Sequence, residues 1–201
     1  FYLVRALDQW DHTMQTLALV VVAVVLALIL AIPLGILAAR HKRFSAFIKP
    51  VLDFMQTMPS LAYLVPVIVL FGIGQVPGAI ATIIFALPPG VRFTELGLRQ
   101  VDAETVEAGA AFGASPRHIL WRIQMPLAMP TIMAGVNQVI MLALSMVVLS
   151  GMVGAGGLGG DVVAALSQVD IGLGMEAGLA VVIVAVYLDR ITSGLAGRTS
   201  L

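Results

Sequence analysis

The stretch "TLALVVVAVVLALILAIPLGILAA", residues 16–39, contains no charged side chain. A helix needs about 20 mainly apolar residues to cross the hydrocarbon core of a bilayer. Residues 16–39 meet that length and end at the basic group "RHKR", residues 40–43. The stretch therefore predicts a membrane-spanning helix with positive charge at one end.

The composition of the whole chain agrees with a membrane protein. Of its 201 residues, 60% are hydrophobic and 11% are charged, and the mean hydropathy is +1.03. A soluble domain has about 25% charged residues, so this chain could not cover a water-facing surface. We expect an all-α integral membrane protein with a single domain over residues 1–201. The net charge of zero gives no support for a nucleic-acid partner.

Further apolar stretches continue this pattern along the chain. No charged residue occurs between 54 and 91, and the Pro and Gly residues of "GIGQVPG", 72–78, predict a turn that divides this stretch into a hairpin of helices. The last stretch is the weakest, because Glu176 interrupts it. The five expected spans are residues 16–39, 57–72, 76–91, 129–152 and 171–188.

The distribution of Lys and Arg predicts how these spans are oriented. With five spans and the N-terminus outside, the inner segments are about 40–53, 92–125 and 189–201, and they hold ten of the 11 basic residues. Only Arg5 lies outside. We therefore expect the C-terminus in the cytoplasm. Because position 1 is Phe rather than Met, we also expect further N-terminal sequence upstream.

The inner segment 92–125 is rich in charge, with four of the 11 basic and four of the 11 acidic residues. Residues 102–112, "DAETVEAGAAF", favour a helix with acids near its start, where the helix dipole stabilises them. Gly113 is placed as a helix C-terminal glycine, Ser115 as an N-cap and Pro116 as a first helical residue. We expect two short helices with a sharp bend at Gly113. Composition alone allows either a solvated loop that fixes the angle of the neighbouring spans or a docking surface.

The same segment resembles the EAA loop of ABC importer permeases. That pattern is Glu-Ala-Ala, three residues, Gly, nine residues and Ile-x-Leu-Pro. Here "EAG" at 107–109 is followed after three residues by Gly113 and after nine more by "IQMP" at 123–126. The spacing matches throughout, and two positions depart from the pattern, Gly109 for Ala and Met125 for Leu.

The resemblance covers nearly the whole chain from about residue 10. The segments "MQTMPSLAYLVPVIVLFGIG", "IIFALPPGVR", "FGASPR", "PLAMPTIMAGVNQ", "MLALSMVV" and "GAGGLG" look like the permease of the glycine betaine/proline betaine importers. The likeness implies a type I importer fold with five core helices and a cytoplasmic coupling helix, in the bacterial cytoplasmic (inner) membrane. It also implies a second copy of the permease, two cytoplasmic ABC ATPase subunits that bind ATP and Mg, and an extracytoplasmic substrate-binding protein.

In this family the loop transmits closure of the ATPases to the membrane helices. The resemblance therefore implies an ATPase contact centred on three residues and flanked by three more. The centre is Glu107, Ala108 and Gly113, and the flanks are Ala111, Ser115 and Arg117.

The chain shows no motif for energy-converting or catalytic chemistry. It lacks the G-x-x-x-x-G-K-[ST] phosphate loop, so we expect ATP hydrolysis in a partner and no cofactor here. "GAGGLG", 154–159, formally fits G-x-G-x-x-G, but it ends a membrane span, which favours close packing or an outer turn. The three histidines, His12, His41 and His118, lie outside the spans without an H-E-x-x-H pattern. We expect neither an enzyme nor a metal site.

Few polar residues lie within the spans. Asn137, Met141 and Ser145 share one helix face at i, i+4 and i+8. They could line the translocation path, because buried polar groups face a cavity or a partner helix. Alternatively, they form hydrogen bonds between helices at the dimer interface.

The substrate is less well defined by the residues. An aromatic cage usually binds a quaternary ammonium, but aromatics are 6% of the chain, and Tyr63 is the lone Tyr or Trp in a well-defined span. Selectivity is therefore expected in the binding protein. Choline, carnitine or an amino acid is an alternative solute. A secondary transporter is the alternative class, although internal repeats and membrane-embedded acids other than Glu176 are not found.

Overall fold

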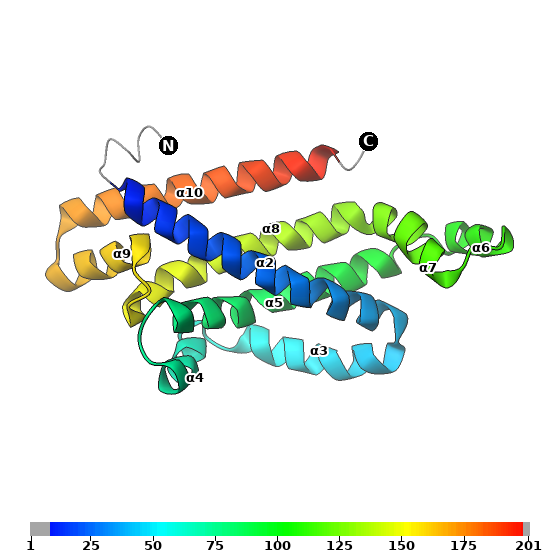
Figure 1. Cartoon of the computed structure of the whole chain (residues 1–201), viewed down its shortest axis with the longest axis horizontal. Helices are drawn as coiled ribbons and strands as arrows, with labels where there is room; N and C mark the ends of the chain where they lie inside the picture. Colours follow the sequence, from blue (N-terminus) through cyan, green and yellow to red (C-terminus); the bar gives the residue numbers. More distant parts are fainter. Residues whose placement is uncertain (1–8, 199–201) are drawn as a thin grey trace.

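A computed structural model describes residues 9–198, apart from the side chains of 195–198. Arg5, expected outside, and the end of the expected inner segment 189–201, including the Arg198 side chain, lie outside the described residues. Every element of the described chain is a helix (Figure 1). The helices are α2 (Trp10–Arg40), α3 (Lys42–Thr57), α4 (Leu61–Phe71), α5 (Gln75–Arg99), α6 (Ala103–Ala111), α7 (Pro116–Ile119), η1 (Leu120–Gln124), α8 (Met125–Ser150), η2 (Gly151–Val153), α9 (Gly157–Gln168) and α10 (Ile171–Arg198).

Four helical stretches are long and apolar enough to cross a membrane, which agrees with an integral membrane protein. They are α2, α5, α10 and the continuous stretch Pro116–Val153 that contains α8. A fifth is present if α3 and α4 are counted as one broken span, bent by 97°. The all-helical membrane fold with four or five spans is therefore confirmed, although several expected boundaries are wrong.

The expected straight span over 57–72 is one of the errors. Only Leu61–Phe71 forms a helix there, because Pro59 holds Met58 in an extended conformation, with φ −72° and ψ 135°, and breaks the chain from α3. The expected inner segment 40–53 is largely the helix α3, which runs back beside α2 (Figure 1). Charged residues Lys49 and Asp53 interrupt the apolar run there and conceal this helix in the sequence.

Other spans are also longer than expected, and one helix was not foreseen. α5 continues through Pro88, Pro89 and Gly90 to Arg99, all three being buried between neighbouring helices. α10 continues past 188 to Arg198, and α9 occupies the expected outer loop. The prolines do not end α5, because contacts with the neighbouring helices stabilise this buried helix beyond what its own sequence favours.

The core forms where α5 lies between α2 and α8. Glycines bring these helices close together. A Cβ added at Gly135 would lie 2.4 Å from the Cβ of Phe93, and one added at Gly35 would lie 2.5 Å from the Cβ of Thr94. Small residues permit this approach of membrane helices, which then pack through van der Waals contact.

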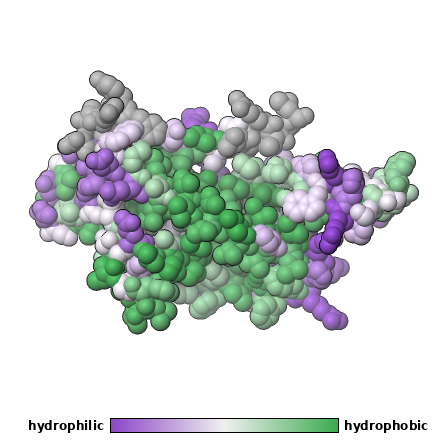
Figure 2. All heavy atoms as spheres, in the orientation of Figure 1, coloured by the Kyte–Doolittle hydropathy of each residue, from purple (hydrophilic) through white to green (hydrophobic). Residues whose placement is uncertain are grey.

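The outer surface of the bundle is apolar along its middle. Figure 2 shows this hydrophobic band, with hydrophilic residues gathered toward the ends of the bundle. On α2 the exposed side chains include Val21, Val25, Leu26 and Ile29. Acyl chains suit such a surface, because it presents no polar group that needs a hydrogen bond.

The end of the bundle that carries α9, called here the α9 end, is closed by the glycine turn 154–159. Gly154, Gly156 and Gly157 have φ values of 77°, 75° and 61°. A Cβ on Gly159 would lie 2.5 Å from the carbonyl oxygen of Val148. Both the expected turn and the expected close packing are confirmed.

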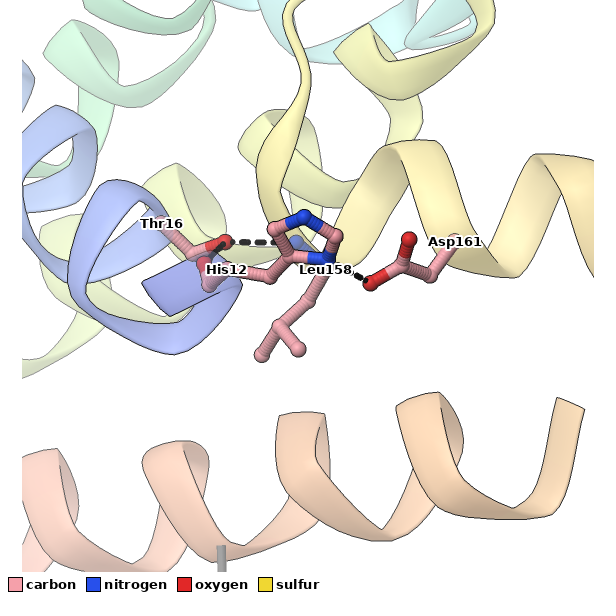
Figure 3. A network of polar contacts seen from close by, with 4 residues as sticks. All are labelled: His12, Thr16, Leu158 and Asp161. Atoms are coloured by element: carbon pink, nitrogen blue, oxygen red, sulfur yellow. Dashed lines mark hydrogen bonds and ion pairs between the residues drawn. The ribbon is translucent and has the colours of Figure 1, made fainter. Parts of the chain in front are cut away.

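A polar network ties this turn to the start of α2 (Figure 3). The Thr16 hydroxyl accepts a hydrogen bond from the backbone N–H of Leu158 at 2.9 Å and donates to the carbonyl oxygen of His12 at 2.9 Å. The His12 ring contacts the Asp161 carboxylate. The first turns of α2 and α9 are thereby held together.

Candidate functional site

The opposite end of the bundle, called here the α6 end, carries a projecting unit made of α6, α7 and the turn between them (Figure 1). α6 spans Ala103–Ala111, one residue inside the expected helix 102–112 at each end. The Asp102 side chain caps it by accepting from the backbone N–H of Glu104 at 3.2 Å. No residue of α6 is buried, so the helix presents nearly its whole surface.

The bend at Gly113 is confirmed, together with its two flanking signals. Gly113 has a φ of 80°, a conformation that a residue without a Cβ adopts at no steric cost. Its N–H donates to the carbonyl oxygen of Ala110 at 2.9 Å. Ser115 caps α7 by accepting from the backbone N–H of His118 at 3.3 Å, and Pro116 occupies the first turn.

The expected inner segment, 92–125, is helical at both ends and continuous there with its neighbouring membrane helices. Residues up to Arg99 belong to α5, and from Pro116 onward the chain is helical without a break through η1 into α8. η1 is a π-helical segment, Leu120–Gln124, and such segments are frequent at functional sites. The helix that begins at Pro116 is thus continuous with a helix long enough to span a membrane.

The departure of Gly109 from the EAA pattern has a packing role. A Cβ at this position would lie 2.6 Å from Cδ1 of Ile123 and 3.7 Å from Cγ1 of Ile119. α6 therefore lies close against the helical stretch that follows the bend. The second departure, Met125, is half-buried against a cluster of Leu98, Leu120, Ala128 and Ile132.

The structure brings all six expected coupling residues to the surface of the projecting unit. Every one of them is exposed: Glu107, Ala108, Ala111, Gly113, Ser115 and Arg117. Glu107 also lines a cavity of about 450 Å³ that lies against the ends of α2 and α5, together with Arg40 and Arg99. The Glu107 side chain is exposed and remains open to a partner.

Phe112, which was not among the expected site residues, is the most prominent apolar side chain of this unit. It is 93% exposed next to the bend. Aromatic side chains are enriched at protein interfaces, which makes Phe112 a candidate contact residue. The sequence predicts Phe112 as the last residue of a helix. Its position directly before the glycine bend is the only sequence signal that could have predicted its exposure.

A second missed feature is a buried carboxylate, Glu95, that ties α3 to α5 at the α6 end. Its side chain is about 5% exposed. It accepts from the Ser45 hydroxyl at 2.6 Å and pairs with Arg99 Nε at 2.9 Å and Lys49 Nζ at 3.5 Å. Arg99 also donates to the Ala38 carbonyl oxygen on α2 at 3.0 Å, so three helices meet at this network.

The expected path residues are separated by the fold. Asn137 is half-buried against α10, where its amide donates to Asp189 at 3.2 Å and accepts from Thr192 at 2.7 Å. Ser145 is exposed, and its hydroxyl donates to the carbonyl oxygen of Met141 at 3.0 Å. Asn137 therefore makes hydrogen bonds between helices of one chain, while Ser145 and the half-buried Met141 border an open face.

Neither a metal nor an aromatic cage is indicated by the side chains that the structure describes. Residues 9–194 contain no group of three His, Asp or Glu residues that could hold a metal ion. Tyr63 packs edge-on against Phe85 with ring centroids 5.5 Å apart, and its hydroxyl donates to the Met55 carbonyl oxygen. The ring is thus occupied by contacts within the chain.

Comparison with known proteins matches this architecture to transport systems. The family described as "Binding-protein-dependent transport system inner membrane component" matches residues 31–198. The chain is 52% identical over 98% of its length to ProW of Escherichia coli strain K12, a glycine betaine/proline betaine transport system permease protein, and covers 55% of that protein. It is 50% identical over 97% of its length to OpuAB of Bacillus subtilis strain 168, a glycine betaine transport system permease protein, and covers 69% of it.

The chain thus spans about half the length of ProW and about two thirds of OpuAB. Among solved structures, a chain of the inward-facing MetNI methionine ABC transporter superposes with a TM-score of 0.84 at 19% identity, covering 92% of this chain and 93% of that chain. This likeness shows a shared fold. The chain belongs to the family of binding-protein-dependent transport system inner membrane components and has the fold of a type I ABC transporter permease.

Proposed function

We propose that this chain is the permease subunit of an ATP-driven importer for a compatible solute such as glycine betaine or proline betaine. The observation that carries the proposal is the 52% identity over nearly the whole chain to a permease of a system that transports these solutes. Such solutes are zwitterions with a carboxylate and a quaternary ammonium. Because aromatics are 6% of the chain and Tyr63 is held by contacts within the chain, we assign selectivity to an extracytoplasmic binding protein.

The projecting unit at the α6 end is the proposed contact with the ATPase. No residue of its helix α6 is buried, and Phe112 adds an apolar anchor to the expected polar and small residues. ATP and Mg bind in the partner, and closure of two ATPase subunits moves α6 and α7. The helix that continues from α7 through η1 into α8 carries this movement into the membrane.

This assignment also orients the chain in the proposed bacterial inner membrane. The α6 end lies in the cytoplasm with Arg40, Arg99, Arg117 and Arg122, as the distribution of basic residues favours. The N-terminus of this segment then lies outside, where the α9 end meets the binding protein. A second copy of the chain completes the importer.

Reconstitution of the full complex tests the function. The permease, its ATPase and its binding protein are placed in vesicles with ATP on the α6 side, and labelled glycine betaine is added on the α9 side. Uptake that requires both ATP and the binding protein is expected. The Glu107→Lys variant should insert normally and fail to transport, because the charge reversal opposes the ATPase contact. Equal uptake without ATP would overturn the proposal and favour an ion-coupled secondary transporter.

A competition assay in the same vesicles identifies the solute. Unlabelled proline betaine, choline, carnitine and amino acids are added in excess over labelled glycine betaine. Strong competition by the betaines alone supports the assignment. Stronger competition by choline, carnitine or an amino acid would assign the importer to that solute.

A further inference from the structure

One face of α8 is left uncovered by the rest of the chain. α10 lies to one side of this face, where it bonds Asn137, and α4 lies to the other, where it packs around Met146. Exposed residues between these sides recur at spacings of four and seven, so they fall in one stripe along the helix. We call this the α8 stripe; it consists of Leu127, Ala134, Gln138 and Ser145, with the half-buried Met141 among them.

Gln138 is the residue of the α8 stripe whose side chain needs a partner. α8 runs from Met125 to Ser150, so Gln138 lies at its middle, about 18 Å or more from either end at 1.5 Å per residue. The amide makes no hydrogen bond to any residue among 9–194. Ser145 differs, because its hydroxyl already donates to the Met141 carbonyl oxygen.

A glutamine at this depth cannot face acyl chains without leaving its amide unsatisfied, since hydrocarbon offers no hydrogen-bonding group. Its side chain is also too short to reach the bilayer surface. The neighbouring Asn137 faces protein, and both the nitrogen and the oxygen of its amide are hydrogen-bonded to α10. α2 at a similar depth exposes only apolar side chains such as Val25 and Leu26.

We infer that the α8 stripe lines the water-filled passage through the importer, with Gln138 as its polar contact at mid-membrane. The amide N–H groups suit the carboxylate of a small zwitterion. Ala134 and Met141 suit its methylated ammonium, which needs space and no hydrogen bond. The identity of the solute rests on the proposed function, whereas the inference that water reaches the α8 stripe rests on the geometry of α8.

Cysteine accessibility tests this inference directly, because the chain contains no cysteine of its own. Gln138→Cys is made in an otherwise cysteine-free complex and treated from each side with a small, charged, membrane-impermeant methanethiosulfonate. The matched control is Leu26→Cys, which lies near the middle of α2 on an exposed apolar face. Asn137→Cys is the second control, at the same depth but turned toward α10.

Only a thiolate reacts, and it forms readily where water is present, so Gln138→Cys should be labelled at least about tenfold faster than either control. Excess glycine betaine with the binding protein should slow that labelling. Labelling no faster than that of Leu26→Cys would overturn the inference, as would a disulfide between two copies at 138 without any labelling. If the stripe is labelled but glycine betaine is neither transported nor protective, the passage stands and the proposed solute falls.

Discussion

Gly109 lies directly against Ile123, so that a Cβ on the glycine would approach Cδ1 of the isoleucine to 2.6 Å. Gly109 is the last residue of the Glu-Ala-Ala part of the EAA pattern, and Ile123 is the first residue of its Ile-x-Leu-Pro part. The fold brings the two residues together across the bend. The contact sets how closely α6 lies against the stretch that leads into α8. The unit that would meet the ATPase and the helix that would carry its movement are therefore packed on one another.

Gly109→Leu should weaken coupling, whereas Gly109→Ala should be mild. The Ile123 methyl group can turn aside for one added carbon, but a leucine forces α6 away from the helix. We expect uptake to fall well below wild type in the leucine variant with insertion unchanged, measured in vesicles with ATP inside.

The double variant Gly109→Leu, Ile123→Ala supplies the control. Removing the isoleucine side chain makes room for the leucine, so part of the uptake should return, as contacting residues couple by about 0.5–3 kcal/mol. If the double variant instead loses as much uptake as Gly109→Leu and Ile123→Ala lose together when made separately, the contact does not control coupling.

Phe112→Ala should weaken the complex with the ATPase. The side chain is 93% exposed, and truncating a hot-spot residue of an interface costs about 2 kcal/mol or more, roughly a 30-fold weaker affinity. Phe112→Leu should retain much of the binding. Leu166→Ala, an equally apolar change on exposed α9, is the matched control and should bind the ATPase as wild type does. Equal co-purification of all three variants would exclude Phe112 as an anchor.

Gly113→Val should disturb the bend through backbone strain alone. Nothing lies within 4 Å of a Cβ at this position, but its φ of 80° is unfavourable for a β-branched residue. Gly113→Asn tolerates this conformation and serves as the control. We expect ATP-dependent uptake to be lost in the valine variant and largely kept in the asparagine variant. Full uptake by Gly113→Val would mean that the bend can relax without consequence.

The sequence predicts the local chemistry of this end of the molecule better than its long-range contacts. The helix 103–111, the bend at Gly113 and the cap at Ser115 depend on neighbours within a few residues, and all three were expected. Glu95 could not be assigned in the same way, because Ser45, its buried partner, lies 50 positions earlier. Its charge suggested a solvated loop in the sequence, but in the structure the Glu95 carboxylate is buried and paired with other side chains.

The same distinction explains the errors in the membrane spans. Lys49 and Asp53 interrupt an apolar run, so hydropathy alone conceals α3. Pro88 and Pro89 predict an end that packing of α5 between α2 and α8 prevents. Likewise, the spacing of Asn137 and Ser145 places them on one helix face. Only the position of α10 shows that the Asn137 amide is already hydrogen-bonded within the chain.

Ser45→Ala should destabilise the α3–α5 contact. The hydroxyl is a buried donor to the Glu95 carboxylate at 2.6 Å, and losing a hydrogen bond to a charged group costs about 1.5–3 kcal/mol. The measurement is the thermal unfolding midpoint of the purified complex in detergent. Asp53→Asn alters an exposed ion pair with Arg92 and should change stability by less than about 1 kcal/mol. A larger effect from Asp53→Asn than from Ser45→Ala would contradict this ranking.

Thr16→Val should loosen the α9 end without affecting the projecting unit. The variant keeps the shape of the side chain but leaves the buried N–H of Leu158 without its acceptor at 2.9 Å, a loss of about 1–3 kcal/mol. Thr16→Ser retains the hydroxyl and should remain close to wild type. Hydrogen exchange of the complex reports the change locally: the amide of Leu158 and the first turn of α9 should exchange faster in the valine variant, while the amides of α6 should not. Unchanged protection at Leu158 would show that backbone packing of the glycine turn against Val148, rather than the threonine, holds this end closed.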